Sequence, residues 1–200
     1  MEIITFCGGY DHNFAYLIID GKECVLIDPS VLADEILDYV AENGLGLKFV
    51  VVMHSHFDHI VDLEKYKEKG IKIYGYKLLR IRVDKKIDDG DLLKLEKVQM
   101  KVIHTPGHTP DAICLLIENN LFTSDTLFVG CCGRTDLAGG NPGQLKTSLN
   151  KLKLLPVDTV VYPGHDYGET KTSTLRIEKQ NNIYFNNVGR SSGTEKYFCY

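Results

Sequence analysis

The chain has 200 residues, of which 44% are hydrophobic and 25% are charged. These values are typical of a soluble globular protein, and the length is sufficient to bury a large core without disulfide bonds. The formal net charge of -4 disfavours a nucleic-acid or anionic-membrane partner, because binding to phosphates needs an excess of Lys and Arg on one surface.

Targeting signals are not evident in the sequence. The amino terminus has no basic segment followed by an apolar block, so we expect no signal peptide. No apolar run reaches the roughly eighteen residues that a membrane-spanning helix needs. The six cysteines show no Cys-x-x-Cys spacing and fall mostly in apolar segments, where a thiol packs as a small hydrophobic group. We therefore expect a cytoplasmic protein.

The first half of the chain reads as strands and helices separated by short turns. Gly8-Gly9 and Asp20-Gly21 are turn signals, and Asp28-Pro29-Ser30 ends a strand, with Ser30 as the expected N-cap of a helix. A further turn is expected at Asp88-Asp89-Gly90-Asp91. The expected strands span 2–6, 14–19, 23–27, 48–53 and 71–74, and the expected helices span 31–42, 60–69 and 77–83.

The second half alternates in the same way around two loops. Residues 105–110 contain two prolines and a glycine, which excludes helix and central strand, and residues 130–143 form a glycine-rich loop. The expected strands span 92–95, 98–104, 111–118, 121–123 and 159–162, and the expected helices span 143–155 and 171–180. We expect one domain over residues 1–182, with two sheets in the middle and helices outside, and a C-terminal tail over 183–200.

Four residues with metal-binding side chains follow directly after an apolar strand. The segment from Val50 to His59 reads Val-Val-Val-Met-His-Ser-His-Phe-Asp-His. Because side chains alternate along an extended chain, His54 and His56 can point the same way, while Asp58 and His59 lie on the turn that follows. Imidazole and carboxylate are ligands that suit zinc, iron or manganese. The segment predicts a metal site.

Three more candidate ligands also follow strands. His108 lies in the Pro/Gly loop, Asp125 follows Phe122-Thr123-Ser124, and His165 follows Tyr162-Pro163-Gly164. Loops that a rigid core holds at strand ends are where functional sites are usually built. We expect His104, which ends a strand just before the loop of His108, to support or pack against that loop.

These residues resemble the pattern of the metallo-β-lactamase superfamily, which is His-x-His-x-Asp-His, then His, then Asp, then His. All seven positions are present in this order, and the resemblance covers about residues 3 to 182. It implies an α/β fold of the metallo-β-lactamase type. This is an αββα sandwich of two mixed β-sheets with helices on the outer faces and the site at one edge of the sheets.

The resemblance also implies a ligand set for two divalent metal ions, with zinc expected and iron or manganese as alternatives. The ligands of the first ion would be His54, His56 and His108, and those of the second would be Asp58, His59 and His165. Asp125 would bridge the two ions, and Asp58 would orient a hydroxide shared between them. Two metal ions roughly 3.5–4 Å apart lower the pKa of the shared water, which gives a nucleophile at neutral pH.

The segment Thr123-Ser124-Asp125-Thr126-Leu127-Phe128, with Cys132-Gly133-Arg134 after it, resembles glyoxalase II, the hydroxyacylglutathione hydrolase. This resemblance implies that the bridging hydroxide attacks the carbonyl carbon of a small-molecule thioester. The leaving thiolate, with a pKa of about 8.5, departs without a strong general acid. Arg134 matches a basic position that this family uses near glutathione, and a structural role in the glycine-rich loop is the alternative.

Two departures from glyoxalase II affect the expected substrate. Only 35 residues follow His165, which is too few for the helical domain with which glyoxalase II binds glutathione. Asp136 stands where that family has an aromatic residue. We therefore expect a smaller or different thioester as the substrate.

A second resemblance, to the persulfide dioxygenases, rests on Gly133-Arg134-Thr135-Asp136, with His165-Asp166-Tyr167 and Ser173-Thr174 downstream. It implies a single iron ion held by His54, His108 and Asp125, which is the facial arrangement of non-haem iron oxygenases. The candidate ligands are of the same residue types in both families. The sequence alone therefore leaves the hydrolase, which we favour, and the dioxygenase both open.

Overall fold

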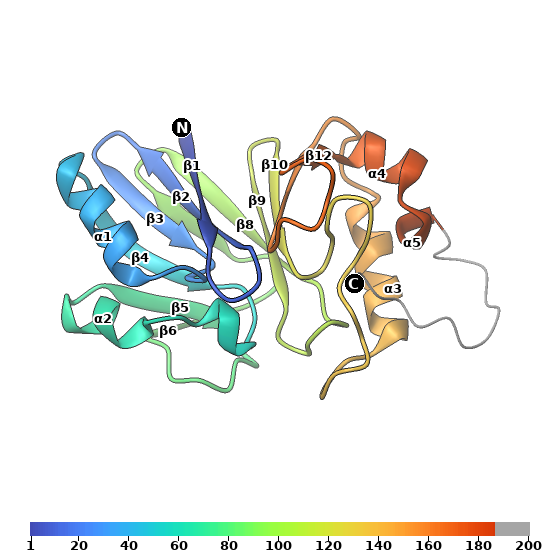
Figure 1. The fold of residues 1–200 in the computed structure, drawn as a ribbon, viewed down its shortest axis with the longest axis horizontal. Helices are drawn as coiled ribbons and strands as arrows, with labels where there is room; N and C mark the ends of the chain where they lie inside the picture. Colours follow the sequence, from blue (N-terminus) through green and yellow to red (C-terminus); the bar gives the residue numbers. More distant parts are fainter. Residues whose placement is uncertain (187–200) are drawn as a thin grey trace. The chain divides into compact units, whose positions relative to one another are not determined.

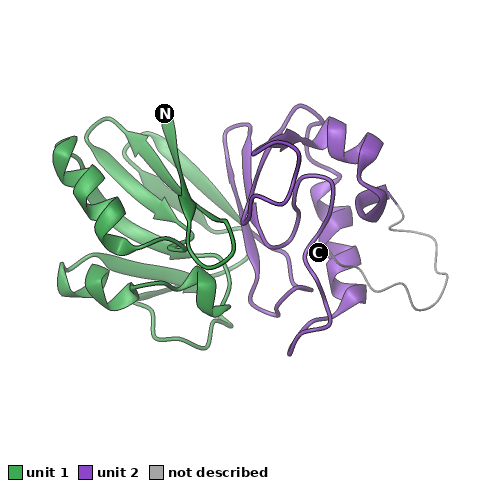
Figure 2. Ribbon diagram, in the orientation of Figure 1, with its two compact units in different colours: residues 1–102 green, residues 103–200 purple. Residues whose placement is uncertain are grey.

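The computed structural model describes residues 1–186, which form two six-stranded sheets and five helices of the α type (Figure 1). The strand order is β1-β2-β3-β4-β5-β6 in the first sheet and β12-β11-β10-β9-β8-β7 in the second. Both sheets are mixed, because each contains parallel and antiparallel pairs. The chain divides into two compact units, residues 1–102 and 103–200 (Figure 2).

The first sheet begins as an antiparallel meander and continues as parallel strands. In the parallel pair β3–β4, Ile27 lies opposite Val51. Because parallel strands end at the same edge of a sheet, the residues after Ile27 and after Val52 emerge together there. The strands are β1 (Glu2–Gly8), β2 (Asn13–Asp20), β3 (Glu23–Ile27), β4 (Gly46–Val52), β5 (Lys72–Tyr76) and β6 (Lys85–Ile87).

Helices α1 (Ala33–Glu42) and α2 (Leu63–Glu68) contribute to the core of the first unit. In α1, Ile36 and Val40 are buried together with alternate side chains of the sheet, such as Val50 and Val52. The predicted N-cap at Ser30 is wrong, because the cap position is Leu32. The Ser30 hydroxyl instead donates a hydrogen bond to the carbonyl oxygen of Phe14, which ties β2 to the end of β3.

The helix predicted over residues 77–83 is wrong. This segment is one turn at Lys77 and Leu78 followed by irregular chain, after which β6 pairs in parallel with β5. Leu79 is buried and packs where Gly75 has no side chain, whereas Leu78 is half exposed. The backbone N–H of Lys77 donates to the carbonyl oxygen of Ile87, so tertiary pairing satisfies the backbone group that a helix would have used.

The second sheet consists of hairpins and one parallel pair. In the parallel pair β10–β11, Ser124 lies opposite Pro163, so Asp125 and His165 follow neighbouring strand ends. The strands are β7 (Leu92–Leu95), β8 (Val98–His104), β9 (Ile113–Ile117), β10 (Asn120–Ser124), β11 (Val160–Pro163) and β12 (Ser173–Thr174).

Helix α3 (Pro142–Leu152) buries Leu145, Leu149 and Leu152 in the core of the second unit. It begins at Asn141, whose side chain accepts a hydrogen bond from the backbone N–H of Gln144. Residues 171–180, predicted as one helix, form β12 and then α4 (Leu175–Asn181). The first four residues of the predicted tail form α5 (Ile183–Asn186), and the rest of that tail lies outside the described residues.

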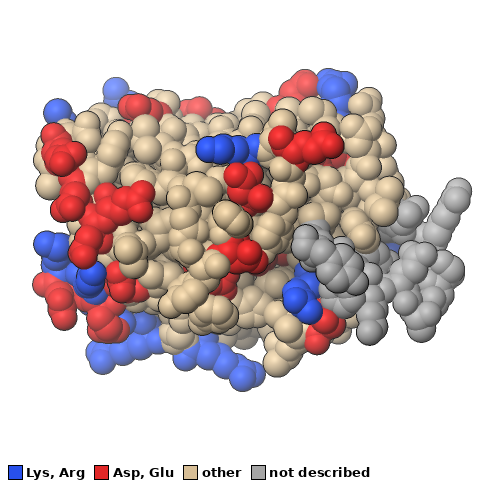
Figure 3. All heavy atoms as spheres, in the orientation of Figure 1, with Lys and Arg blue, Asp and Glu red and all other residues tan. Residues whose placement is uncertain are grey.

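Charged side chains of both signs are interspersed on the face of the molecule in Figure 3, and a group of Lys and Arg side chains lies along its lower left edge. None of the helices within residues 1–186 is long and apolar enough to span a membrane.

Candidate metal centre

Three imidazole rings gather where β4 ends. The strand residues before them, from Val50 to Met53, are fully buried, and the chain then turns through a short 3-10 helix, Phe57–His59. The ring of His54 lies 4.9 Å from that of His56 and 4.2 Å from that of His59, measured between centroids. The structure therefore brings together the histidines that the sequence placed at this strand end.

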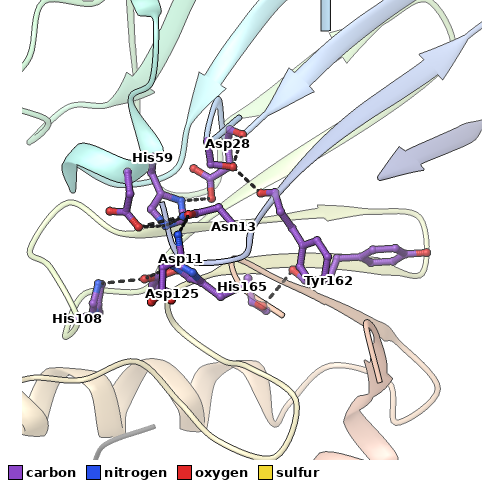
Figure 4. Close-up of polar contacts among 12 residues, drawn as sticks. Asp11, Asn13, Asp28, His59, His108, Asp125, Tyr162 and His165 are labelled. Atoms are coloured by element: carbon purple, nitrogen blue, oxygen red, sulfur yellow. Dashed lines mark hydrogen bonds and ion pairs between the residues drawn. The ribbon is translucent and has the colours of Figure 1, made fainter. Parts of the chain in front are cut away.

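His59 is oriented by a carboxylate that the sequence analysis did not assign to the site. Its Nδ1 lies 3.0 Å from Oδ2 of Asp28, and both side chains are buried (Figure 4). This contact favours the tautomer with the proton on Nδ1, which leaves the lone pair on Nε2 for a metal ion. Asp28 adopts a left-handed backbone conformation, with φ of 58°, and its N–H donates to the carbonyl oxygen of Val51.

Asn13 is a second residue that the sequence analysis missed. It is completely buried, and its Nδ2 donates a hydrogen bond of 2.9 Å to Oδ2 of Asp58. Its Oδ1 accepts a hydrogen bond of 3.0 Å from the backbone N–H of Asp11, which fixes the orientation of the amide. Asn13 therefore positions the Asp58 carboxylate, whose Oδ2 lies 3.5 Å from Nε2 of His59.

The second unit holds the other three predicted ligands close together. Oδ2 of Asp125 lies 3.4 Å from Nε2 of His108 and 3.4 Å from Nε2 of His165 (Figure 4). All three side chains are buried. Nδ1 of His108 donates a hydrogen bond of 2.8 Å to the carbonyl oxygen of Arg134, so the lone pair of this imidazole also lies on Nε2.

The loop that carries His108 is held on several sides. The Ser148 hydroxyl, from α3, donates to the carbonyl oxygen of Pro106, and the Asn141 N–H donates to that of Gly107. Nε2 of His104 lies 2.9 Å from the carbonyl oxygen of Pro110. These contacts bridge both ends of the loop, and they agree with the supporting role expected for His104.

Two glycines allow the close packing around these ligands. A Cβ atom at Gly107, where φ is 143°, would lie 2.3 Å from the backbone of Leu145. A Cβ atom at Gly133 would lie 1.8 Å from the carbonyl oxygen of Asp125 and 3.1 Å from Nδ1 of His108. The glycine-rich loop therefore passes directly against the ligands, and only glycine allows that approach.

Aromatic rings surround His165. The ring of Tyr167 stacks on it, with centroids 4.7 Å apart and planes 10° apart. The ring of Phe128 meets the edge of both rings, at 5.8 Å from His165 and 5.1 Å from Tyr167. This packing restricts the rotation of the His165 imidazole and leaves its Nε2 facing Asp125.

The separations between donor atoms fit a metal ion. Tetrahedral bonds of about 2.0–2.1 Å place neighbouring donor atoms about 3.3–3.4 Å apart. The carboxylate–imidazole separations at Asp125 and Asp58 are 3.4 and 3.5 Å, which is longer than an ordinary hydrogen bond. Asp28, His54 and His59 also offer donor atoms within 4.8 Å of one another. The donor chemistry and the spacing therefore both suit a divalent ion.

The buried cysteines do not contribute thiolates. Burial raises the pKa of Cys24 and of Cys132 to about 12, and that of Cys114 to about 11. Burial therefore favours the protonated thiols over the nucleophilic thiolates at neutral pH.

The fold and the donor residues define a class of protein, the metallo-β-lactamase superfamily, and the chain belongs to it. The model of the family described as "Metallo-beta-lactamase superfamily" matches residues 8–79 and 67–165. The members that this chain resembles include metal-dependent hydrolases, and the membership supports that class of activity.

The curated proteins that are similar to the chain include the following two. One is a hydroxyacylglutathione hydrolase from Pelagibacter ubique, which is 35% identical over 178 residues, covering 85% of this chain and 73% of that protein. The other is a probable polyketide biosynthesis zinc-dependent hydrolase, BaeB, from Bacillus velezensis, which is 31% identical over 186 residues. The match covers 86% of this chain and 81% of that protein. The expected resemblance to glyoxalase II is confirmed.

The solved structures that are similar to this one include the following two. The crystal structure of ETHE1 from Myxococcus xanthus matches with a TM-score of 0.86 and 35% identity, covering 92% of this chain and 84% of that one. The structure of TTHA1623 in a di-iron-bound form matches with a TM-score of 0.79 and 27% identity. The match covers 90% of this chain and 99% of that one. They confirm the expected fold class, two mixed sheets with helices as in metallo-β-lactamases.

Proposed function

We propose that the chain is a glyoxalase II-like thioesterase that holds two divalent metal ions, with zinc as the preferred metal. The proposed ligands of one ion are His54, His56 and His108, those of the other are Asp58, His59 and His165, and Asp125 contacts both. The equal 3.4 Å separations from Asp125 Oδ2 to two imidazole nitrogens support the bridging role, because a bridging oxygen has ligands of both ions as neighbours.

Two divalent ions in such a site act as Lewis acids that polarise a carbonyl group and lower the pKa of a bound water molecule to near 7. Asp58, which Asn13 holds by a hydrogen bond of 2.9 Å, is suited to orient the attacking water through its carboxylate. The Asp28 carboxylate, 3.0 Å from Nδ1 of His59, favours the tautomer with the proton on that nitrogen. The leaving thiolate has a pKa of about 8.5, so it departs without a strong general acid.

The single observation that carries this proposal is the match to hydroxyacylglutathione hydrolase, at 35% identity over 85% of the chain, in a chain that has all seven His and Asp positions. Arg134 is the proposed substrate-facing residue. It lies on the loop whose main chain contacts His108, so a substrate bound at the metal centre would be close to it.

The alternative function is that of a persulfide dioxygenase with one iron ion held by His54, His108 and Asp125. Two observations favour it as the second candidate. The structure of ETHE1 is similar to this one with a TM-score of 0.86. The segment from Gly133 to Asp136, which resembles that family, packs directly against the ligands His108 and Asp125.

A measurement of metal per chain, combined with assays of thioester hydrolysis and of oxygen uptake, distinguishes the two functions. The full chain would be purified from medium supplemented with zinc, iron or manganese, and metal per chain would be measured. Two metal ions with hydrolysis of a small panel of thioesters would support the thioesterase. One iron ion per chain, with oxygen uptake on glutathione persulfide and no thioester hydrolysis, would overturn it.

A further inference from the structure

Two exposed aromatic side chains of the first unit, Tyr10 and Phe57, pack against each other. Their ring centroids lie 5.2 Å apart and their planes are 70° apart, which is an edge-to-face arrangement. Tyr10 is 72% exposed and Phe57 is 68% exposed, the two highest values for Tyr and Phe side chains among residues 1–186. Single exposed apolar side chains are common, whereas two rings in contact form a continuous apolar surface that a ligand can cover. We call these two residues the aromatic pair.

Phe57 stands between two of the proposed metal ligands, His56 and Asp58, as the first residue of the short 3-10 helix. The Cα atoms of both neighbours are therefore about 3.8 Å from its own. The N–H of His59 donates a hydrogen bond of 3.0 Å to the carbonyl oxygen of His56, so the turn that places the ligands also fixes the backbone of Phe57. Its exposed ring adds nothing to the core, and a substrate held by these ligands has the aromatic pair beside it.

Tyr10 lies on the loop between β1 and β2, which is tied to the same ligands. The N–H of Asp11 donates a hydrogen bond of 3.0 Å to Oδ1 of Asn13, and Nδ2 of Asn13 donates one of 2.9 Å to Oδ2 of Asp58. On the other side of Tyr10, Gly9 has φ of 70°, and a Cβ atom there would lie 2.3 Å from a main-chain carbonyl oxygen of the segment after β3. The loop is therefore held on both sides of Tyr10, which fixes where its ring projects.

We propose that the aromatic pair binds the acyl group of the thioester, so that the protein prefers acyl groups with an apolar chain to acetyl. This inference rests on the proposed thioesterase function and specifies its substrate class. The residues that it adds are Tyr10 and Phe57, which determine specificity and take no part in the attack on the carbonyl carbon. The acyl group is the part of the substrate that suits two uncharged rings, because thiol carriers such as glutathione are polar and charged.

The size of the preference follows from the apolar surface that leaves water. Complete burial of one methylene group raises affinity about fourfold, and an open surface that covers one side of a chain gives about twofold. A hexanoyl group has four methylene groups more than an acetyl group, so we expect kcat/KM to favour the hexanoyl thioester about tenfold. Removing one of the two rings exposes part of the bound chain again and should reduce this ratio about threefold.

The test compares hexanoyl and acetyl thioesters of N-acetylcysteamine in the metal-loaded full chain. Tyr10→Ser should lower kcat/KM for the hexanoyl thioester, mainly through KM, and leave the acetyl thioester unchanged. Tyr10→Phe keeps the ring and should keep the wild-type ratio. Replacing the thiol by glutathione at constant acyl group should leave the effect of Tyr10→Ser the same. An effect that follows the thiol, or an equal fall for both acyl groups, would overturn the inference.

A matched control is available in the same unit. Leu78, in the turn after β5, is 52% exposed, and Leu78→Ser removes an exposed apolar side chain there. It should leave the ratio unchanged, and a fall equal to that of Tyr10→Ser would refute a specific role for the aromatic pair. Metal per chain is measured in every variant. The mass in solution is measured too, because a dimer that dissociates in Tyr10→Ser with an unchanged ratio would make the pair an interface between copies and overturn the inference.

A binding measurement separates this inference from the proposed function. Hydroxamates chelate divalent metal ions and contain no thioester, so hexanohydroxamate and acetohydroxamate present the same two chains without being substrates. Their Kd values would be measured by calorimetry. We expect hexanohydroxamate to bind the wild type about tenfold more tightly, and Tyr10→Ser to lose about threefold of this difference. That result without hydrolysis of any thioester would refute the thioesterase and leave the apolar binding surface standing. Hydrolysis with equal Kd values for the two hydroxamates, or binding of neither, would overturn the inference.

Discussion

Oδ2 of Asp125 lies 3.4 Å from Nε2 of His108, a separation that is too long for a hydrogen bond and suits two ligands of one metal ion. The proton of His108 is held on the other ring nitrogen by the carbonyl oxygen of Arg134. The same oxygen of Asp125 is equally far from His165. Metal binding should therefore depend more on this carboxylate than on any other.

Replacing Asp125 by Ala should remove most of the bound metal, because its carboxylate is proposed to contact both ions. Asp58→Ala should lose one ion preferentially and keep the other. The measurement is metal per chain after dialysis against a weak chelator, with Asp158→Ala as a control at an exposed carboxylate. Full metal occupancy in Asp125→Ala would rule out the bridging role.

Asn13→Ala should weaken binding of the ion held by Asp58 and His59 about tenfold, because residues that orient metal ligands typically contribute a factor of that size. The buried amide donates to the Asp58 carboxylate, and Ala removes that donor. The metal affinity is measured by competition with a chromophoric chelator. Asn43→Ala is the control, since the side chain of Asn43 bonds only to the main chain of α1 at the surface. Equal affinities in both variants would contradict the role of Asn13.

The sequence predicts the site residues that stand close together in the chain, and it misses residues that only the fold brings to the site. His54, His56, Asp58 and His59 are recognisable because they stand within six residues after one apolar strand. Asn13 carries no such signal. It follows a polar loop in which an asparagine is ordinary, and the pairing of β2 with β3 and of β3 with β4 brings it to Asp58, forty-five positions away.

The long buried strands of the fold were predicted well, whereas the short strands β6 and β12 and the short helical segments were not. Strands β2, β3 and β4 are buried, and their apolar runs are unambiguous. Residues 77–83 alternate charged and apolar side chains in a way that suits a helix or a turn equally. The pairing of β6 with β5 favours the turn over the helix, and the sequence pattern of residues 77–83 does not reveal that pairing.

Ser124→Gly should stabilise the protein by about 1 kcal/mol. Ser124 has φ of 45°, in the left-handed region where a residue with a Cβ atom is strained and glycine is not. The change in the free energy of unfolding is measured by urea denaturation. Ser124→Ala serves as the control, because it removes the hydroxyl and keeps the strain. A gain of the same size in Ser124→Ala would show that the backbone conformation is not the cause.

Tyr66→Phe should leave stability unchanged or raise it by about 1 kcal/mol. The Tyr66 side chain is fully buried in the core of the first unit, and its hydroxyl has no hydrogen-bond partner among residues 1–186. Burying a hydroxyl without a partner costs free energy, and Phe removes the group while keeping the ring. The measurement is the midpoint of urea unfolding. A clear loss of stability would reveal a partner for the hydroxyl.

Stability should fall as the pH rises above 9, because buried thiols resist ionisation in the folded state. Burial raises the pKa of Cys114 from 9.0 to about 11 and that of Cys132 to about 12. Above pH 9 the unfolded chain releases these protons while the folded chain keeps them, so the unfolded state binds fewer protons and stability decreases with pH. Each thiol contributes a slope of about 1.4 kcal/mol per pH unit until its folded pKa is reached.

The contribution of one thiol is isolated by comparing the wild type with Cys114→Ala. Loss of packing lowers the stability of this variant at every pH, whereas the titration changes only the slope between pH 9 and about 11. We therefore expect the two curves of unfolding free energy against pH to converge by about 1.4 kcal/mol per unit in that window. Parallel curves would show that the folded state ionises Cys114 as readily as the unfolded chain does.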